Sequence, residues 1–192
     1  FRILSMGHAQ LGQFIGAKGP NTAVNAACAS GAQAIGIAMD WIRLGRCDRV
    51  LVVTADDVTN SSNLPWIGAG FLAAGAATVE GDVTKAAIPF GSKRNGMILG
   101  GGASAFVIER DELVEQRGMI PVGDILSAHF SNSAFHGTRL DGNFIAKAFE
   151  TVVQEVEVKT GFTRPELAKK SFFMSHETYT PARGGSSQAE VD

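Results

Sequence analysis

The chain has 192 residues, carries a formal net charge of −2 and is 45% hydrophobic, with apolar residues spread along its length. This near-neutral composition gives no reason to expect binding to nucleic acid or to an anionic membrane, and no apolar run is long enough to cross a bilayer. Its two cysteines, Cys28 and Cys47, provide no disulfide framework or metal cluster, so we expect a reducing compartment, the cytoplasm.

The first part of the chain shows patterns of strands and one helix. Residues 21–27 alternate weakly between polar and apolar side chains, which predicts a strand ending at Cys28. Apolar residues recur at spacings of three and four in residues 30–44, so this segment is expected to be a helix that ends at Gly45. The apolar run of residues 49–57 is typical of a strand covered on both faces.

The rest of the chain continues this alternation. Asn-Leu-Pro-Trp at residues 63–66 resembles a loop, and residues 145–159 have the apolar face of an amphipathic helix. Thr-Arg-Pro-Glu at residues 163–166 fits the capping box of another helix. Further strands are predicted at residues 103–110, 122–131 and 171–176. Strands that alternate with helices indicate an α/β protein, because parallel strands are joined by such crossovers.

Cys28 lies among very small residues, in the stretch NAACASGA. A helix is expected to begin just after it, and the unpaired N–H groups and positive dipole at a helix start stabilise a thiolate. The small neighbours leave room for a substrate. A buried structural cysteine fits the same pattern, and spacing alone leaves the two interpretations open. Cys47, beside charged residues, has no such setting and is expected to be structural.

A cysteine nucleophile needs a partner for proton exchange, usually a histidine. His176 ends the last predicted strand and precedes Thr178 and Thr180, whose hydroxyls would face the same way in an extended segment and suit an extended ligand. A strand end that turns through proline fits the same residues. The other histidines, which are expected to be surface or packing residues, are His8, His129 and His136.

Four segments, taken in chain order, resemble β-ketoacyl-acyl carrier protein synthases (ketosynthases) of the thiolase-like condensing-enzyme superfamily. They are GPNTAVNAACASGAQAI, LGRCDRVLVVTADD, PFGSKRNGMILGGGASAFVIER and MSHETYTPARGG. The resemblance implies that Cys28 is the nucleophile and His176 the first active-site histidine. It places Thr178 and Thr180 where the family contacts the pantetheine arm. Phe71, in a stretch that fits a short helix or a pocket lining, is expected to contact substrate as well.

The resemblance also implies a decarboxylative Claisen condensation in fatty acid or polyketide synthesis. Cys28 would accept an acyl group from a carrier-protein thioester, and a malonyl carrier would lose CO₂ to give the attacking enolate. His176 and a second histidine would stabilise the enolate charge, and the N–H of Cys28 would form half of a separate oxyanion hole. The implied partners are an acyl carrier protein and a second copy of the chain, and no metal or other cofactor is expected beyond the carrier's phosphopantetheine.

The implied fold is part of the duplicated αβαβα five-layer arrangement. Residues 1–110 would be the later part of the N-terminal half, and residues 111–192 the early part of the C-terminal half. The chain begins with Phe1 and lacks the family's second histidine, so it is expected to be an interior piece that is inactive when expressed alone.

Some positions depart from the family pattern and leave substrate preference open. Glu177 replaces a glycine, Gly91 replaces a common aspartate, and Glu190 is a candidate for the family's downstream acidic residue. Two alternatives to the ketosynthase also stay open at this point. VNAACASGAQAI resembles the cysteine segment of thiolases, which act on acyl-CoA, and a ketosynthase-like scaffold subunit without activity would keep the fold.

Overall fold

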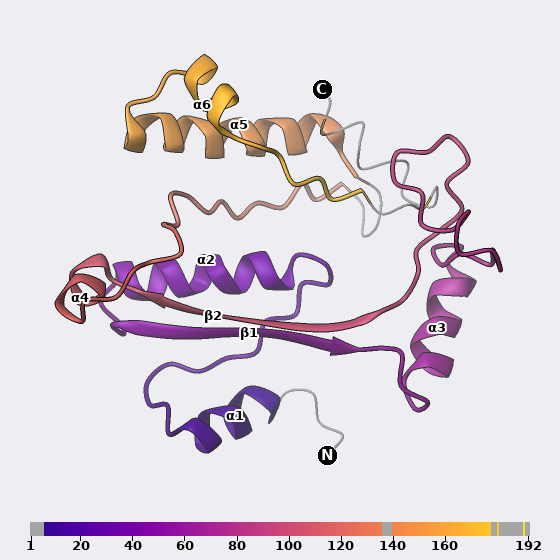
Figure 1. Ribbon diagram of the computed structural model, residues 1–192, viewed down its shortest axis with the longest axis horizontal. Coiled ribbons are helices and arrows are strands. Elements are labelled where there is room, and N and C mark those ends of the chain that lie inside the picture. The colour runs from indigo at the N-terminus through magenta and orange to yellow at the C-terminus, as the bar shows by residue number, and fades with distance from the viewer. Residues whose placement is uncertain (1–5, 136–139, 178–179, 181–189, 191–192) are drawn as a thin grey trace. The chain divides into compact units, whose positions relative to one another are not determined.

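The computed structural model describes residues 6–135, 140–177, 180 and 190 (Figure 1). Helices and strands are mixed along the chain, which confirms the α/β class. The elements in chain order are α1 (Gly7–Ile15), α2 (Ser30–Arg43), β1 (Arg49–Asp57), α3 (Leu64–Ala73), β2 (Gly101–Glu109), α4 (Asp111–Gln116), α5 (Gly142–Thr160) and α6 (Arg164–Lys170).

Strands β1 and β2 pair with each other in the described sheet. The Arg49 side chain donates hydrogen bonds to Glu109, and the hydroxyls of Thr54 and Ser104 lie 2.7 Å apart. Rising numbers on one strand therefore meet falling numbers on the other, so this pair is antiparallel, not parallel as the alternation of elements suggested. The expected strands at residues 49–57 and 103–110 are confirmed.

Three other predicted strands are wrong. Residues 21–27, 122–131 and 171–176 belong to no strand ladder in the described structure, although two of them are rich in strand-forming residues. A strand is defined by hydrogen bonds to a neighbouring strand, so a favourable local pattern is not sufficient. The prediction that other elements of this chain bury both faces of β1 is also wrong, because Val52 is the only buried residue of this strand.

The loop predicted at residues 63–66 is wrong as well, because α3 begins there. Pro65 occupies the first turn of the helix, where its missing N–H costs no hydrogen bond. Just upstream, the Asn60 side chain accepts hydrogen bonds from the N–H groups of Ser62 and Asn63 and closes the turn into the helix. The proline that suggested a loop is instead a helix-start signal.

The described contacts group the chain into two compact units. One unit contains residues 1–54 and 103–128, and the other contains residues 55–102 and 129–192. Their buried apolar side chains are Ala38, Met39 and Val52 in the first unit and Val58, Ala76 and Ala86 in the second. The predicted division at residue 110 follows chain order and stays a prediction. Among the described residues, no helix is both long and apolar enough to span a membrane.

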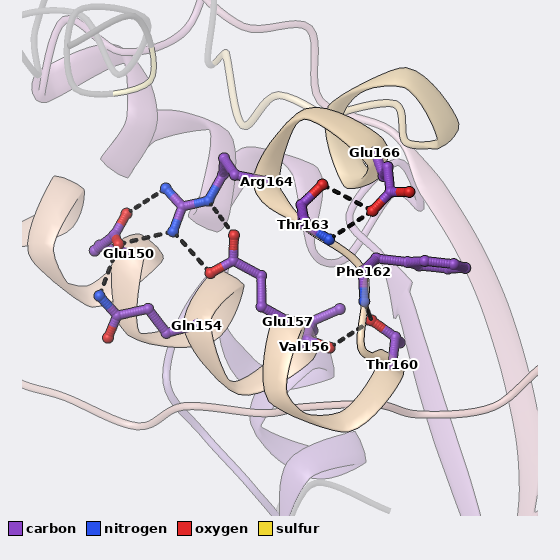
Figure 2. A network of polar contacts seen from close by, with 9 residues as sticks. All are labelled: Glu150, Gln154, Val156, Glu157, Thr160, Phe162, Thr163, Arg164 and Glu166. Atoms are coloured by element: carbon purple, nitrogen blue, oxygen red, sulfur yellow. Dashed lines mark hydrogen bonds and ion pairs between the residues drawn. The ribbon is translucent and has the colours of Figure 1, made fainter.

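Helices α5 and α6 form a hairpin that confirms two of the sequence predictions (Figure 2). Gly161 ends α5 in the left-handed region, with φ of 71°. Thr163 and Glu166 complete the predicted capping box at the start of α6. Arg164 then reaches back to α5, where its guanidinium donates two 2.8 Å hydrogen bonds to Glu150 and a 2.7 Å hydrogen bond to Glu157.

This hairpin is expected to lose stability in acid. The hydrogen bonds from Arg164 and, to a smaller extent, Gln154 lower the pKa of Glu150 from its ordinary value of 4.5. A carboxyl whose pKa is lowered by folding stabilises the fold above its ordinary pKa, and this contribution disappears as the pH falls through the folded-state pKa. In urea unfolding of the whole protein, Glu150→Gln should be slightly less stable than the wild type at about pH 7, and the difference should shrink as the pH falls through the lowered pKa of Glu150.

The control is the same substitution in an Arg164→Gln background. Without the guanidinium, Glu150→Gln should cause a smaller loss at neutral pH, because only the Gln154 hydrogen bond to Glu150 remains. A difference between Glu150→Gln and the wild type that persists unchanged in acid would contradict the assignment.

Candidate functional site

Cys28 is presented by a tight turn that leads into α2. Ala27, the residue before it, has a positive φ of 49°, which is unusual for a residue with a side chain. The N–H of Ala29 donates to the carbonyl of Ala26 at 3.1 Å, and Ser30 bridges the turn with its hydroxyl. That hydroxyl accepts from the N–H of Ala26 at 2.8 Å and donates to the carbonyl of Ala27 at 2.7 Å. A strained turn held this firmly fixes where Cys28 lies.

The side chain of Cys28 is exposed and precedes the first turn of α2, which starts at Ser30. The predicted setting of a thiol just before a helix start is therefore confirmed as local geometry, and the interpretation of a buried structural cysteine is wrong for this chain. Gly31 contributes to it, because a β-carbon there would lie 3.4 Å from the Thr54 methyl group on β1. Small side chains thus allow the helix start to approach the strand closely.

Cys47 has the opposite setting. It is half-buried, and its pKa is raised mainly by burial and secondarily by the negative charge of Asp48. A raised pKa leaves less thiolate at neutral pH, and the thiolate is the reactive form. The two cysteines therefore differ in access to solvent, and Cys47 is the natural internal control for chemistry at Cys28.

His176 lies in the second unit, and its backbone is held by side chains on both sides. Its N–H donates to Glu190 Oε1 at 2.8 Å, and the Ser175 hydroxyl donates to the other oxygen of the same carboxylate. The N–H of Glu177 donates to the Ser175 oxygen at 3.0 Å. The His176 side chain itself is exposed. Glu190 and Ser175 therefore hold the backbone around His176, and the sequence patterns did not assign these contacts; only the candidate acidic role of Glu190 pointed to them.

The other predicted substrate contacts also belong to the second unit. Thr180 is fully buried, and its hydroxyl donates to the carbonyl of Gly75 at 3.3 Å, just beyond the end of α3. Phe71 is half-buried in α3, and its carbonyl accepts the N–H groups of Ala76 and Ala77. Thr180 thus contacts a residue just beyond the end of α3, the helix that contains Phe71. Thr178 lies outside the described residues, so its predicted alignment with Thr180 stays a prediction.

A loop at residues 94–97 packs against the segment that follows α3, through hydrogen bonds to Thr78. Thr78 donates its hydroxyl proton to Asn95 at 2.7 Å, and the N–H of Thr78 donates to the carbonyl of Met97 at 2.9 Å. Gly96 has φ of 131°, which favours glycine. The loop presents Arg94 toward the segment that follows His176, with Arg94 Nε 3.8 Å from an oxygen of Glu177. Sequence patterns gave no sign of this contact.

The structure thus groups Phe71, His176 and Thr180 in one unit, and describes Cys28 within the other. The catalytic and binding roles of these residues stay predictions. Within the described residues, no group of three or more His, Cys, Asp or Glu side chains is arranged to hold a metal ion.

Residues 2–113 match the family model described as "Beta-ketoacyl synthase, N-terminal domain". Among curated proteins, the chain is 31% identical to 3-oxoacyl-(acyl-carrier-protein) synthase 2 of Vibrio cholerae, over 94% of this chain and 42% of that protein. It is 34% identical to the tetracenomycin polyketide synthase ketoacyl synthase alpha subunit of Streptomyces glaucescens, over 76% of this chain and 34% of the relative. The chain therefore spans less than half the length of these relatives.

Solved structures show the same fold. A β-ketoacyl synthase from Burkholderia phymatum aligns with 95% of this chain and 42% of its own, at a TM-score of 0.79 and 24% identity. A second solved structure is described as a type II PKS acyl-carrier protein in complex with its ketosynthase bound to the hexaketide. One chain of this complex aligns with 81% of our chain and 38% of its own, at a TM-score of 0.65 and 24% identity. The predicted α/β fold of the thiolase-like ketosynthases is confirmed.

Proposed function

Because this chain belongs to the β-ketoacyl synthase family, we propose that the whole protein condenses an acyl thioester held on Cys28 with malonyl-acyl carrier protein. The observation that carries this proposal is the tight turn that exposes Cys28 just before α2. A nucleophile must be accessible and held in one place, and the Ser30 hydrogen bonds supply the second condition.

The proposed reaction has two parts. In the first, the Cys28 sulfur attacks the carbonyl carbon of an acyl thioester, a new carbon–sulfur bond forms, and the carrier's thiol leaves. In the second, malonyl thioester loses CO₂, and its enolate carbon attacks the acyl group and releases the Cys28 sulfur. His176 donates a hydrogen bond to the thioester oxygen on which the enolate charge develops. The backbone N–H of Cys28 serves the acyl oxygen in the first part.

The proposed partners follow from the same chemistry. The acyl and malonyl groups arrive on acyl carrier protein, whose phosphopantetheine arm is the only organic group that the reaction needs. One solved relative is a ketosynthase in complex with such a carrier, which supports this partner. We also propose a homodimer and a cytoplasmic location. Relatives named as a 3-oxoacyl-(acyl-carrier-protein) synthase and as a polyketide ketoacyl synthase both match this chain. Experiment must decide whether the protein serves fatty acid or polyketide synthesis.

Two other functions were open from the residues alone. The match of residues 2–113 to the β-ketoacyl synthase family disfavours a thiolase that acts on acyl-CoA. A scaffold subunit without activity shares the fold, so the fold does not argue against it. The exposure of Cys28 favours the enzyme over the scaffold, because a scaffold gains nothing from an accessible thiol in a strained turn.

The test uses the whole purified protein and acyl carrier protein loaded with a saturated acyl group. Peptide mass spectrometry should find the acyl group on Cys28 and not on Cys47. Addition of malonyl-acyl carrier protein should then release CO₂ and yield β-ketoacyl-acyl carrier protein. Condensation of acyl-CoA without CO₂ release would indicate a thiolase, and an unlabelled Cys28 with no product would indicate a scaffold.

A further inference from the structure

Two charged side chains meet beside the segment that carries His176. Arg94 and Glu177 are far apart in the chain, and Arg94 Nε lies 3.8 Å from Glu177 Oε1. The Glu177 side chain is only 3% exposed, and that of Arg94 is 25% exposed. A carboxylate this deeply buried has lost most of its hydration, so a nearby cation strongly affects its energy. The contact is therefore more deeply buried than the ion pairs of α5 and α6, whose side chains are 22% to 48% exposed.

Arg94 approaches Glu177 from a well-supported loop. The neighbouring side chain of Asn95 accepts a hydrogen bond from the Thr78 hydroxyl at 2.7 Å and donates one to the carbonyl of Lys85 at 3.1 Å. Among the described residues, Arg94 Nε has no hydrogen-bond partner, so ionic attraction to Glu177 is its evident role. Because the backbone that carries Arg94 is held in place, its guanidinium can restrain the side chain of Glu177.

Glu177 is bonded directly to His176, so any restraint on Glu177 acts on the histidine. Consecutive Cα atoms are about 3.8 Å apart, and the peptide between them is planar. On its other side, His176 is held by Glu190 through its backbone N–H and by Ser175, which also accepts the N–H of Glu177. Arg94 adds the restraint on the side chain that follows the histidine. Glycine, the family residue at position 177, offers no side chain to restrain.

We propose that Arg94 and Glu177 are positioning residues for His176. The inference rests on the proposed function, in which His176 stabilises the enolate formed when malonyl thioester loses CO₂. The pair sets the backbone from which the imidazole reaches the thioester oxygen, so it contributes to decarboxylation and condensation. It makes no contribution to acyl transfer onto Cys28, because that step uses a different oxyanion hole.

The two halves of the pair should not be equivalent. Arg94→Met removes the cation beside a carboxylate that is only 3% exposed, whereas Glu177→Gln leaves an arginine whose side chain is 25% exposed. We expect condensation kcat to fall about 100-fold in Arg94→Met and about 10-fold in Glu177→Gln, since a misplacement near 1 Å costs about 100-fold. The double variant should resemble Glu177→Gln, because it removes both charges. Arg94→Lys, which keeps the charge, should recover part of the loss.

The experiment measures three quantities in the whole protein: acyl label on Cys28, CO₂ release from malonyl-acyl carrier protein, and condensation kcat. The expected result is that acyl labelling stays within about twofold of the wild type, while CO₂ release and condensation fall together. Glu157→Gln is the matched control. It removes a half-buried carboxylate from an arginine in the same unit, at Arg164, and should change none of the three.

Equal losses of acyl labelling and condensation would show that the pair only stabilises the fold, and this would overturn the inference. Unchanged condensation in Glu177→Gln and in the double variant would also overturn it. These two variants decide the question if Arg94→Met does not fold. A wild-type protein that neither acylates Cys28 nor condenses would overturn the proposed function itself, which is a different result from a pair that has no effect.

Discussion

Cys28→Ala in the whole protein is expected to abolish acyl labelling and to lower condensation by at least about 1,000-fold. The thiol is the atom that forms the bond to the acyl group, and alanine offers nothing to replace it. The substitution should leave the fold intact, because the side chain is exposed and the turn is held by the Ser30 hydroxyl instead. Acyl labelling by mass spectrometry and product formation are the measurements.

Cys47→Ala is the matched control for this experiment. It removes the other thiol, whose pKa is raised by burial and by Asp48, and it should keep acyl labelling and condensation close to the wild type. Selective iodoacetamide labelling should follow the same order, with Cys28 modified first. Full activity in Cys28→Ala, or acyl label on Cys47 alone, would remove Cys28 from the mechanism.

Gly96→Ala is expected to have the largest effect on stability, a loss of about 2–4 kcal/mol. A β-carbon at Gly96 would lie 2.5 Å from backbone atoms of Ala77 and Thr78, and φ there is 131°. Backbone atoms cannot move aside as a flexible side chain can, so the 94–97 loop would separate from Ala77 and Thr78. Urea unfolding of the whole protein measures the loss. Condensation should fall as well, because the loop carries Arg94.

Gly100→Ala is the control, since it adds the same methyl group a few residues further along the chain. A β-carbon there would have nothing within 4 Å, and the backbone of Gly100 is not in the left-handed region. Its stability should stay within about 0.5 kcal/mol of the wild type. Equal effects of the two substitutions would mean that the close approach at Gly96 does not constrain the loop.

Three helices of this protein, α2, α5 and α6, were predictable from sequence because helices are held by contacts between near neighbours. The spacing of apolar residues predicted α2 and α5, and Thr163 with Glu166 predicted the start of α6. The small residues around Cys28 likewise indicated an uncrowded thiol before a helix. Each of these features depends on residues a few positions apart, so one segment contains all the information.

The strands were less predictable because a strand needs a partner that its own residues do not specify. Residues 122–131 and 171–176 have strand-like composition and yet form no strand in the described structure, whereas β1 and β2 pair with each other. The proline in α3 shows the same limit on a smaller scale. Its meaning depended on the turn that the Asn60 side chain closes just before the helix.

The sequence by itself thus determined three of the helices, α2, α5 and α6, together with the family and the candidate nucleophile, Cys28. Only the tertiary structure decided how the His176 segment is held. Glu190 reaches the backbone of His176, Thr180 is buried against Gly75, and Arg94 meets Glu177 from a distant loop. Contacts between distant segments form when the chain folds, and no local pattern encodes which charge will meet which. The acidic side chain that departs from the family's glycine became interpretable once its arginine partner was in place.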